Sequence, residues 1–213
     1  GIKIGIKMTD LILHKNIDIQ HYDNDVILNH PDVQSLLVKK EFKRNWNLQL
    51  VDLRSALPEF YNWCEDFFNS KITVTRFFVS LPNSTTVVHE DFGYNVALNI
   101  PIINCNKYSK NVWYNVDLNK KPKFDRQRDA NSVNYVANDG AGFMFPEDSI
   151  MEPIFEMILD CPTLFNTSVP HNVITEEFEF KSYPRIVLSV RTESMKRSSN
   201  TSFEDFIKSH EHV

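Results

Sequence analysis

The spacing of apolar residues changes once along the chain, near residue 70. Before that point apolar residues recur every three or four positions, which predicts amphipathic helices over residues 31–42 and 55–70. In the second helix we expect Ser55 as the N-cap and Pro58 in the first turn. The apolar stripe of this helix consists of Leu57, Phe60, Tyr61, Cys64, Phe67 and Phe68.

After residue 70 the pattern becomes that of short strands, rich in β-branched and aromatic residues and separated by turns. Turns about every 8 to 12 residues are typical of sandwiches, barrels and jelly rolls. We expect a charged loop over residues 119–131, a hairpin turn over 138–140 and a final helix over 203–210 capped by Ser202. The predicted strands cover residues 71–80, 85–88, 94–103, 111–117, 132–137, 141–145, 163–166, 172–176 and 185–192.

These elements predict one mainly β domain over residues 1–213. A chain of 213 residues is long enough for one sizeable core and short for two full domains. Residues 1–70 would form a mixed, partly helical support, residues 71–194 the β core, and residues 195–213 a C-terminal tail and helix.

The composition argues against several classes of protein. The net charge of −5 disfavours wholesale binding of nucleic acid. The five glycines form no phosphate-binding loop, which counts against P-loop and dinucleotide-binding folds. Three cysteines without a C-x-x-C pair indicate thiols in a reducing compartment. Residues 1–7 lack the apolar core of a signal peptide and no apolar run is long enough to span a membrane, so we expect a cytoplasmic protein.

The segment His89-Glu90-Asp91 is the first candidate for metal chemistry. In an extended segment, residues i and i+2 project to the same side, so His89 and Asp91 could reach one ion while Glu90 points away. Such a short motif often arises by chance. Here it follows an apolar strand and precedes a bend at Phe92-Gly93, an arrangement that would deliver both side chains to a rim.

A third ligand should come from a distant strand, and His171 is the best candidate. It follows Pro170 at the edge of a predicted strand, whereas the remaining histidines lie in the N-terminal segment or the C-terminal tail. Taken alone, a histidine in this position is more often a loop residue without a metal role. Two imidazoles and one carboxylate on one side of a metal are the ligand set of non-haem Fe(II) oxygenases.

Two arginines on the last predicted strand could bind a carboxylate. By strand alternation Arg185 and Arg191 point to the same side, and a guanidinium can hold a carboxylate through two parallel hydrogen bonds. A hairpin returning from His171 would place Arg185 at the start of the neighbouring strand, with Arg191 as its competitor. Without the histidines, both would be read as surface residues.

Together these residues resemble the 2-oxoglutarate/Fe(II)-dependent dioxygenase superfamily over residues 71–194. The resemblance looks strongest toward small, uncharacterised prolyl and aspartyl/asparaginyl hydroxylase-like proteins, some of them viral. It implies a double-stranded β-helix, a cupin-like jelly roll whose mouth holds the metal. The matching features are His89, Asp91, a strand over residues 97–101, His171 and Arg185.

The resemblance implies Fe(II), 2-oxoglutarate and O2 as cofactor and cosubstrates, with release of succinate and CO2. His89, Asp91 and His171 would be the iron ligands. Arg185 would hold the far carboxylate of 2-oxoglutarate, and Arg191 is a lesser candidate for that role. Lys181 is a further lesser candidate for that role, because family members also use lysine at this place.

Other residues near the expected mouth are weaker candidates. Asn99 could contact 2-oxoglutarate, and Trp113 and Tyr114 could contact the substrate, although core packing is at least as common for such residues. Residues 147–160 do not match the family pattern and could shape the mouth. Asp91 separates the chain from those hydroxylases that lack a carboxylate ligand.

The resemblance also bears on partners. A protein side chain or small metabolite is expected as the primary substrate in preference to nucleic acid, and no membrane partner is expected. The cytoplasm would be that of the cell or, for a viral protein, of the infected host. Two other functions remain compatible with the sequence: a non-catalytic jelly-roll binding module, and a cupin-type metal enzyme that does not use 2-oxoglutarate.

Overall fold

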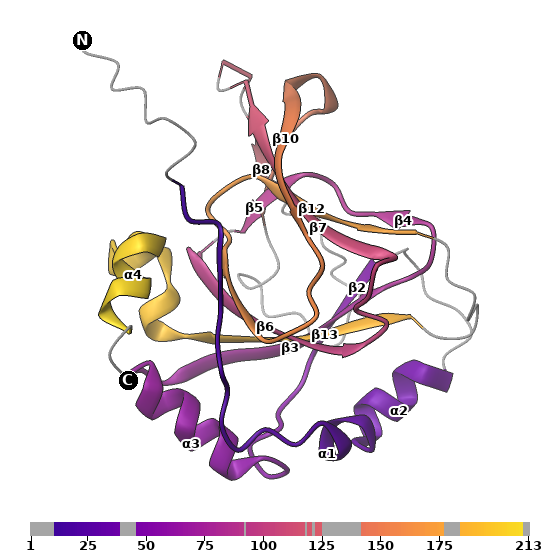
Figure 1. Cartoon of the computed structure of the whole chain (residues 1–213), viewed down its shortest axis with the longest axis vertical. Coiled ribbons are helices and arrows are strands. Elements are labelled where there is room, and N and C mark those ends of the chain that lie inside the picture. The colour runs from indigo at the N-terminus through magenta and orange to yellow at the C-terminus, as the bar shows by residue number, and fades with distance from the viewer. Residues whose placement is uncertain are drawn as a thin grey trace.

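Two antiparallel β-sheets face one another in the computed structural model (Figure 1), which describes residues 11–38, 46–91, 93–117, 119–120, 122–124, 142–176 and 184–210. The first sheet has the strand order β1 (His14–Asn16), β11 (Thr163–Asn166), β6 (Val96–Ile103), β13 (Arg185–Thr192), β3 (Ile72–Ser80) and β2 (Trp46–Leu50). The second has the order β10 (Ile150–Met157), β7 (Ser109–Val116), β12 (His171–Thr175), β5 (His89–Asp91), β9 (Gly142–Met144) and β8 (Lys123–Phe124), and β4 (Ser84–Thr85) pairs with β12.

The chain passes back and forth between the two sheets. β3 and β6 lie in the first sheet, whereas β5 and β7, which follow them in turn, lie in the second. After β10 the chain returns in the same alternating way through β11, β12 and β13, so that β13 pairs with both β3 and β6. This order is that of a double-stranded β-helix, and it confirms the predicted mainly β, jelly-roll fold.

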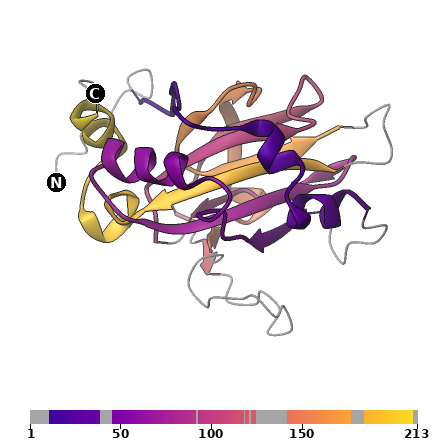
Figure 2. The same cartoon turned by 90° about the horizontal axis from the view of Figure 1, so that it is seen from below.

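Helices support the first sheet on its outer face, as Figure 2 shows from below. These are α1 (Asn24–Leu28), α2 (Pro31–Val38) and α3 (Pro58–Phe67). The C-terminal helix α4 (Phe203–Ser209) has Ser202 as its N-cap, as predicted. Short 3-10 turns are η2 (Glu147–Ser149), η3 (Glu193–Met195) and η4 (Arg197–Ser199). Among the described residues, no helix has the length and apolar character needed to cross a membrane.

Alternate residues of β13 separate the main core from the space between the sheets. Ile186, Leu188 and Val190 are buried in the main apolar cluster, which includes residues of α1, α2, α3 and α4. Val187 points the other way and belongs to a smaller cluster with Trp113 of β7. The face of β13 that carries Val187 is therefore the interior face, and every second residue of the strand is directed between the two sheets.

Several predicted elements are confirmed. The strands expected over residues 71–80, 163–166 and 185–192 correspond to β3, β11 and β13. The helix expected over residues 55–70 is present but shorter. It begins at Pro58 with Leu57 in place of Ser55 as N-cap, because residues 54–56 form a turn.

Other expectations differ from the structure. Residues 147–160, which match no family pattern, contain β10, which pairs with β7 along most of its length. The strand expected over residues 85–88 ends early as β4, and the next strand begins at His89 itself. The predicted strand 132–137, the turn 138–140 and most of the loop 119–131 lie outside the described residues. The single-domain organisation stays a prediction.

A buried carboxylate joins α3 to the start of β3. The side chain of Glu65 is 8% exposed and accepts hydrogen bonds from Nη2 of Arg54 and Nζ of Lys71, each at 2.7 Å. It also accepts from the backbone nitrogen of Ile72 at 3.1 Å. Burial opposes the ionisation of Glu65, but these hydrogen bonds outweigh it and lower its pKa to about 2.

Glu65→Gln should destabilise the protein at pH 6 and progressively less in acid. The pKa of Glu65 is lower in the folded chain than its ordinary 4.5, so its ionised form stabilises the fold fully above about pH 4.5. This stabilisation is lost as the pH falls toward 2. Thermal midpoints between pH 2 and 7, with the exposed neighbour Asp66→Asn as control, measure the effect. A difference in thermal midpoint between wild type and Glu65→Gln that does not become smaller in acid would contradict this prediction.

Candidate metal centre

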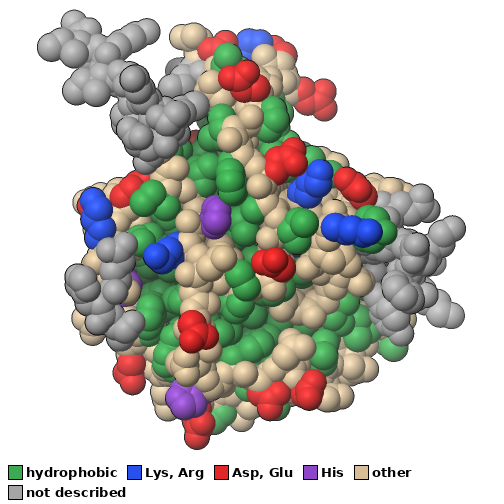
Figure 3. Space-filling model, viewed as in Figure 1, with side chains coloured by type: hydrophobic (Ala, Val, Ile, Leu, Met, Phe, Trp, Pro, Cys, Tyr) green, Lys and Arg blue, Asp and Glu red, His purple; other side chains and the backbone are tan. Residues whose placement is uncertain are grey.

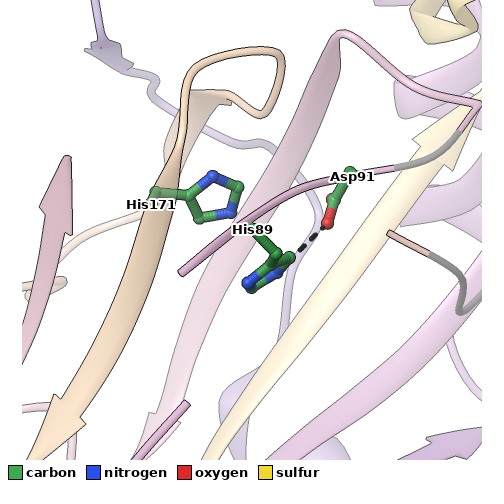
Figure 4. Close-up of side chains that lie close together, drawn as sticks. All are labelled: His89, Asp91 and His171. Atoms are coloured by element: carbon green, nitrogen blue, oxygen red, sulfur yellow. Dashed lines mark ion pairs between the residues drawn. The ribbon is translucent and has the colours of Figure 1, made fainter. Parts of the chain in front are cut away.

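The three predicted metal ligands are brought together by the pairing of β5 with β12. His171 lies directly opposite His89 in this pair, and their ring centroids are 4.6 Å apart. Strand alternation places Asp91 on the same side as His89. One ligand atom from each residue lies within 4.8 Å of the others, and Figure 4 shows the side chains converging. We call these three residues the triad.

Backbone carbonyls determine which nitrogen of each imidazole faces the triad. Nδ1 of His89 lies 2.8 Å from the carbonyl oxygen of Val87, and Nδ1 of His171 lies 2.8 Å from that of Val169. A carbonyl oxygen only accepts hydrogen bonds, so Nδ1 donates and carries the proton of the neutral ring. In the neutral form of each ring Nε2 is therefore the unprotonated nitrogen, the form in which it can bind a metal.

The protonation states of the other triad groups also suit a cation. Burial opposes the ionisation of Asp91, but the adjacent Arg191 and His89 outweigh burial and hold the pKa of Asp91 well below its ordinary value. Burial and the neighbouring His89 lower the pKa of His171 to about 4. At neutral pH the site thus presents an ionised carboxylate and a neutral His171 ring, the forms that bind divalent metals.

Contacts on the other side of β5 hold Asp91 in place. Glu90 points away from the triad, and its carboxylate lies 3.4 Å from Nη2 of Arg197. The same Nη2 donates to the backbone oxygen of Asp91 over 3.2 Å. Gly93 has φ +86°, a conformation that L side chains rarely adopt, so the bend after Asp91 requires glycine.

Arg191 is the basic residue that contacts the triad. It is 1% exposed, and its Nη2 forms an ion pair with Oδ2 of Asp91. Its guanidinium carbon lies 4.9 Å from the ring centroid of Tyr94. Nε and Nη1 are buried and have no hydrogen-bond partner among the described residues. An unsatisfied buried donor costs roughly 1–3 kcal/mol, so binding of a further acceptor to Nε and Nη1 would be favourable.

Arg185 is buried further along the same face of β13. It is 2% exposed, and its Nε donates to Oγ of Ser109 on β7 over 3.2 Å. Within the described part of the chain no carboxylate forms an ion pair with Arg185, and burial lowers its pKa. A buried cation without an anion is costly. The other basic candidate, Lys181, lies outside the described residues.

Two of the three weaker candidates lie on the interior faces of the sheets. Trp113 is opposite His171 in the pairing of β7 with β12, with ring centroids 6.2 Å apart. Asn99 lies on β6, and its Oδ1 is buried without a partner in the described chain. Tyr114 points to the opposite face of the second sheet, where its hydroxyl donates to Asn172. This position disfavours a substrate contact by Tyr114, whereas the roles of Asn99 and Trp113 stay predictions.

Sequence reasoning missed the groups that orient the triad. The carbonyls of Val87 and Val169 give no sequence signal, because every residue has a carbonyl. Arg197 lies in η4, outside every predicted strand, and its contacts with Glu90 and Asp91 become visible only in the folded chain. Arg197 thus joins the HxD segment to the C-terminal part of the chain.

The chain resembles some solved structures in its backbone, at low sequence identity. HygX from Streptomyces hygroscopicus, solved with nickel and 2-oxoglutarate bound, is 10% identical with a TM-score of 0.40 over 83% of this chain and 80% of HygX. E. coli ycfD is 11% identical with a TM-score of 0.40 over 94% of this chain and 55% of ycfD. No protein-family model and no curated protein matches the sequence. The site is defined by the positions of this chain's own residues.

Alanine at any triad position should abolish tight metal binding. Loss of a residue that merely orients a ligand lowers metal affinity about 10–100-fold, so loss of a ligand should lower it at least about 100-fold. Calorimetric titration of Ni²⁺ into His89→Ala, Asp91→Ala and His171→Ala measures this, with circular dichroism to verify folding. The exposed His21→Ala is the matched control and should bind Ni²⁺ like wild type. Unchanged affinity in any triad variant would contradict the assignment.

Proposed function

We propose that the chain is an Fe(II)- and 2-oxoglutarate-dependent oxygenase that hydroxylates a protein side chain or a small molecule. The convergence of His89, Asp91 and His171 carries this proposal, together with the ionised carboxylate and the Nδ1 hydrogen bonds that direct Nε2 of each ring toward the triad. Two imidazoles and one carboxylate suit Fe(II) and leave positions on the metal for other ligands.

A dicarboxylate complements the charges beside the triad. Arg191 has two buried donors without partners, and Arg185 has no carboxylate partner in the described chain. Carboxylate oxygens are acceptors, so 2-oxoglutarate can satisfy one arginine at each end. Arg191 would hold the end nearer the metal because it already contacts Asp91, and Arg185 would hold the far carboxylate.

The residues of the chain bind and orient the reactants. When bound, iron supplies the activation of O2, and 2-oxoglutarate is oxidised to succinate and CO2 while the substrate gains a hydroxyl group. Arg191 holds Oδ2 of Asp91, while Oδ1 lies 3.5 Å from Nε2 of His89. Trp113 is fully buried beside His171 and excludes water from that side of the triad.

Surface charge supports a protein side chain or a small metabolite as primary substrate. On the described part of the face in Figure 3, basic side chains are scattered among acidic ones and do not form one stripe. The whole chain has a net charge of −5. Binding to a nucleic-acid backbone requires concentrated positive charge, so we favour the other two substrate classes.

Arg185→Met should weaken 2-oxoglutarate binding and leave Ni²⁺ binding unchanged. Removing one partner of a buried charge pair costs about 2 kcal/mol or more, which corresponds to an affinity loss of about 30-fold or more. Calorimetric titration of the Ni²⁺-loaded protein measures this loss. Lys208→Met, which removes an exposed positive charge on α4, is the control and should bind 2-oxoglutarate like wild type.

Turnover gives a second readout for the same variants. With Fe(II), O2 and 2-oxoglutarate, wild type should form succinate and His171→Ala should not. If Arg185→Met bound 2-oxoglutarate as tightly as wild type, a cupin-type metal enzyme that does not use 2-oxoglutarate would account better for the triad. If wild type bound neither metal nor cosubstrate, the non-catalytic binding module would be the better account.

A further inference from the structure

Asn111 of β7 is a buried polar residue that neither the triad nor the arginines account for. It is 3% exposed, and its Nδ2 has no hydrogen-bond partner among the described residues. The same is true of Oγ1 of Thr175 on β12, which is 2% exposed. Buried polar groups in native proteins nearly always have a partner. Each position therefore implies a group that the described chain does not supply.

Strand pairing places Asn111 between the triad and the anchor of Arg185. Trp113 lies opposite His171, and Asn111 is two residues earlier on β7, on the same interior face. Ser109 is two residues earlier again, and its Oγ accepts the hydrogen bond from Nε of Arg185. Along β7, Asn111 therefore lies between the level of the triad and the level of Ser109, which anchors Arg185.

The length of a five-carbon diacid decides which unpartnered group it can reach. Each strand residue rises about 3.3 Å, so Asn111 lies about 7 Å along the strand from the level of His171. Thr175, which is opposite Ser109, lies about 13 Å along. Four carbon–carbon bonds span about 5 Å, and a metal–oxygen bond adds about 2 Å. The far carboxylate of 2-oxoglutarate thus reaches Asn111 and falls short of Thr175.

On the basis of the proposed function, we infer that Nδ2 of Asn111 donates to the far carboxylate that Arg185 holds. Asn111 is therefore a specificity-determining residue for the cosubstrate. Ser109 acts as a positioning residue: it occupies Nε of Arg185 and leaves the two Nη groups for the anion. A carboxylate presents only acceptors, which matches an amide and a guanidinium. The site therefore prefers 2-oxo acids that end in a carboxylate over those that end in a methyl group.

Asn111→Leu tests this role, because it removes the donor and keeps a similar volume. On the Ni²⁺-loaded protein its affinity for 2-oxoglutarate should be about tenfold lower than that of wild type. Its affinity for 2-oxopentanoate, which ends in a methyl group, should be unchanged. Asn111→Asp should weaken 2-oxoglutarate binding further, because the new carboxylate would pair with Arg185, whereas Asn83→Asp adds the same charge at an exposed turn and should not. Thr175→Val is the matched buried control and should bind 2-oxoglutarate like wild type.

The thermal midpoint of the ligand-free protein separates a cosubstrate contact from a structural role. Because Nδ2 of Asn111 has no partner in the described chain, Asn111→Leu should not lower this midpoint. Equal affinity of wild type and Asn111→Leu for 2-oxoglutarate overturns the role of Asn111. A loss of equal size for both oxo acids, or a loss in Thr175→Val instead, also overturns it.

The titrations with metal and with cosubstrate distinguish a wrong role for Asn111 from a wrong proposed function. If Arg185→Met weakens 2-oxoglutarate binding and Asn111→Leu does not, the role of Asn111 is wrong and the proposed function stands. If wild type binds neither Ni²⁺ nor 2-oxoglutarate, the proposed function is wrong, and the role of Asn111 is wrong with it.

Discussion

The direct pairing of His89 with His171 is the contact on which the candidate site depends. β5 and β12 are neighbours in the second sheet because the chain alternates between sheets as it winds through the double-stranded β-helix. Two imidazoles from distant parts of the sequence therefore face one another, and strand alternation adds Asp91 beside them. Hydrogen bonds to Val87 and Val169 then direct Nε2 of each ring toward the common point.

Charge buried between the sheets links this triad to the proposed cosubstrate. Arg185 and Arg191 lie on the interior face of β13, where an isolated cation is unfavourable. Asp91 neutralises Arg191, but no described carboxylate does so for Arg185. Natural proteins often accept such destabilising groups where function requires them. An anion that binds both arginines would compensate this buried positive charge, and its binding free energy would stabilise the fold.

Much of this arrangement could be predicted from local sequence. Strand periodicity is a local property of the sequence. It was the basis for predicting the HxD, His171 and the arginines of β13 as site residues. The N-cap of α3 could not be predicted from the preference of Ser55, because the turn over residues 54–56 ends before the helix begins. Strand β10 carries exposed residues on both faces and lacks the usual alternation, so pairing with β7 was its only signal. The role inferred for Asn111 likewise depends on the register of β7 with β12, which is a long-range property of the fold.

A crystal structure of the protein grown with Ni²⁺ and 2-oxoglutarate tests the central claim most directly. We predict one nickel ion bound by Nε2 of His89, Nε2 of His171 and a carboxylate oxygen of Asp91. The far carboxylate of 2-oxoglutarate should lie on Arg185 within hydrogen-bond distance of Nδ2 of Asn111. Nickel bound elsewhere, or a vacant triad beside an Arg185 that contacts only water, would contradict the account.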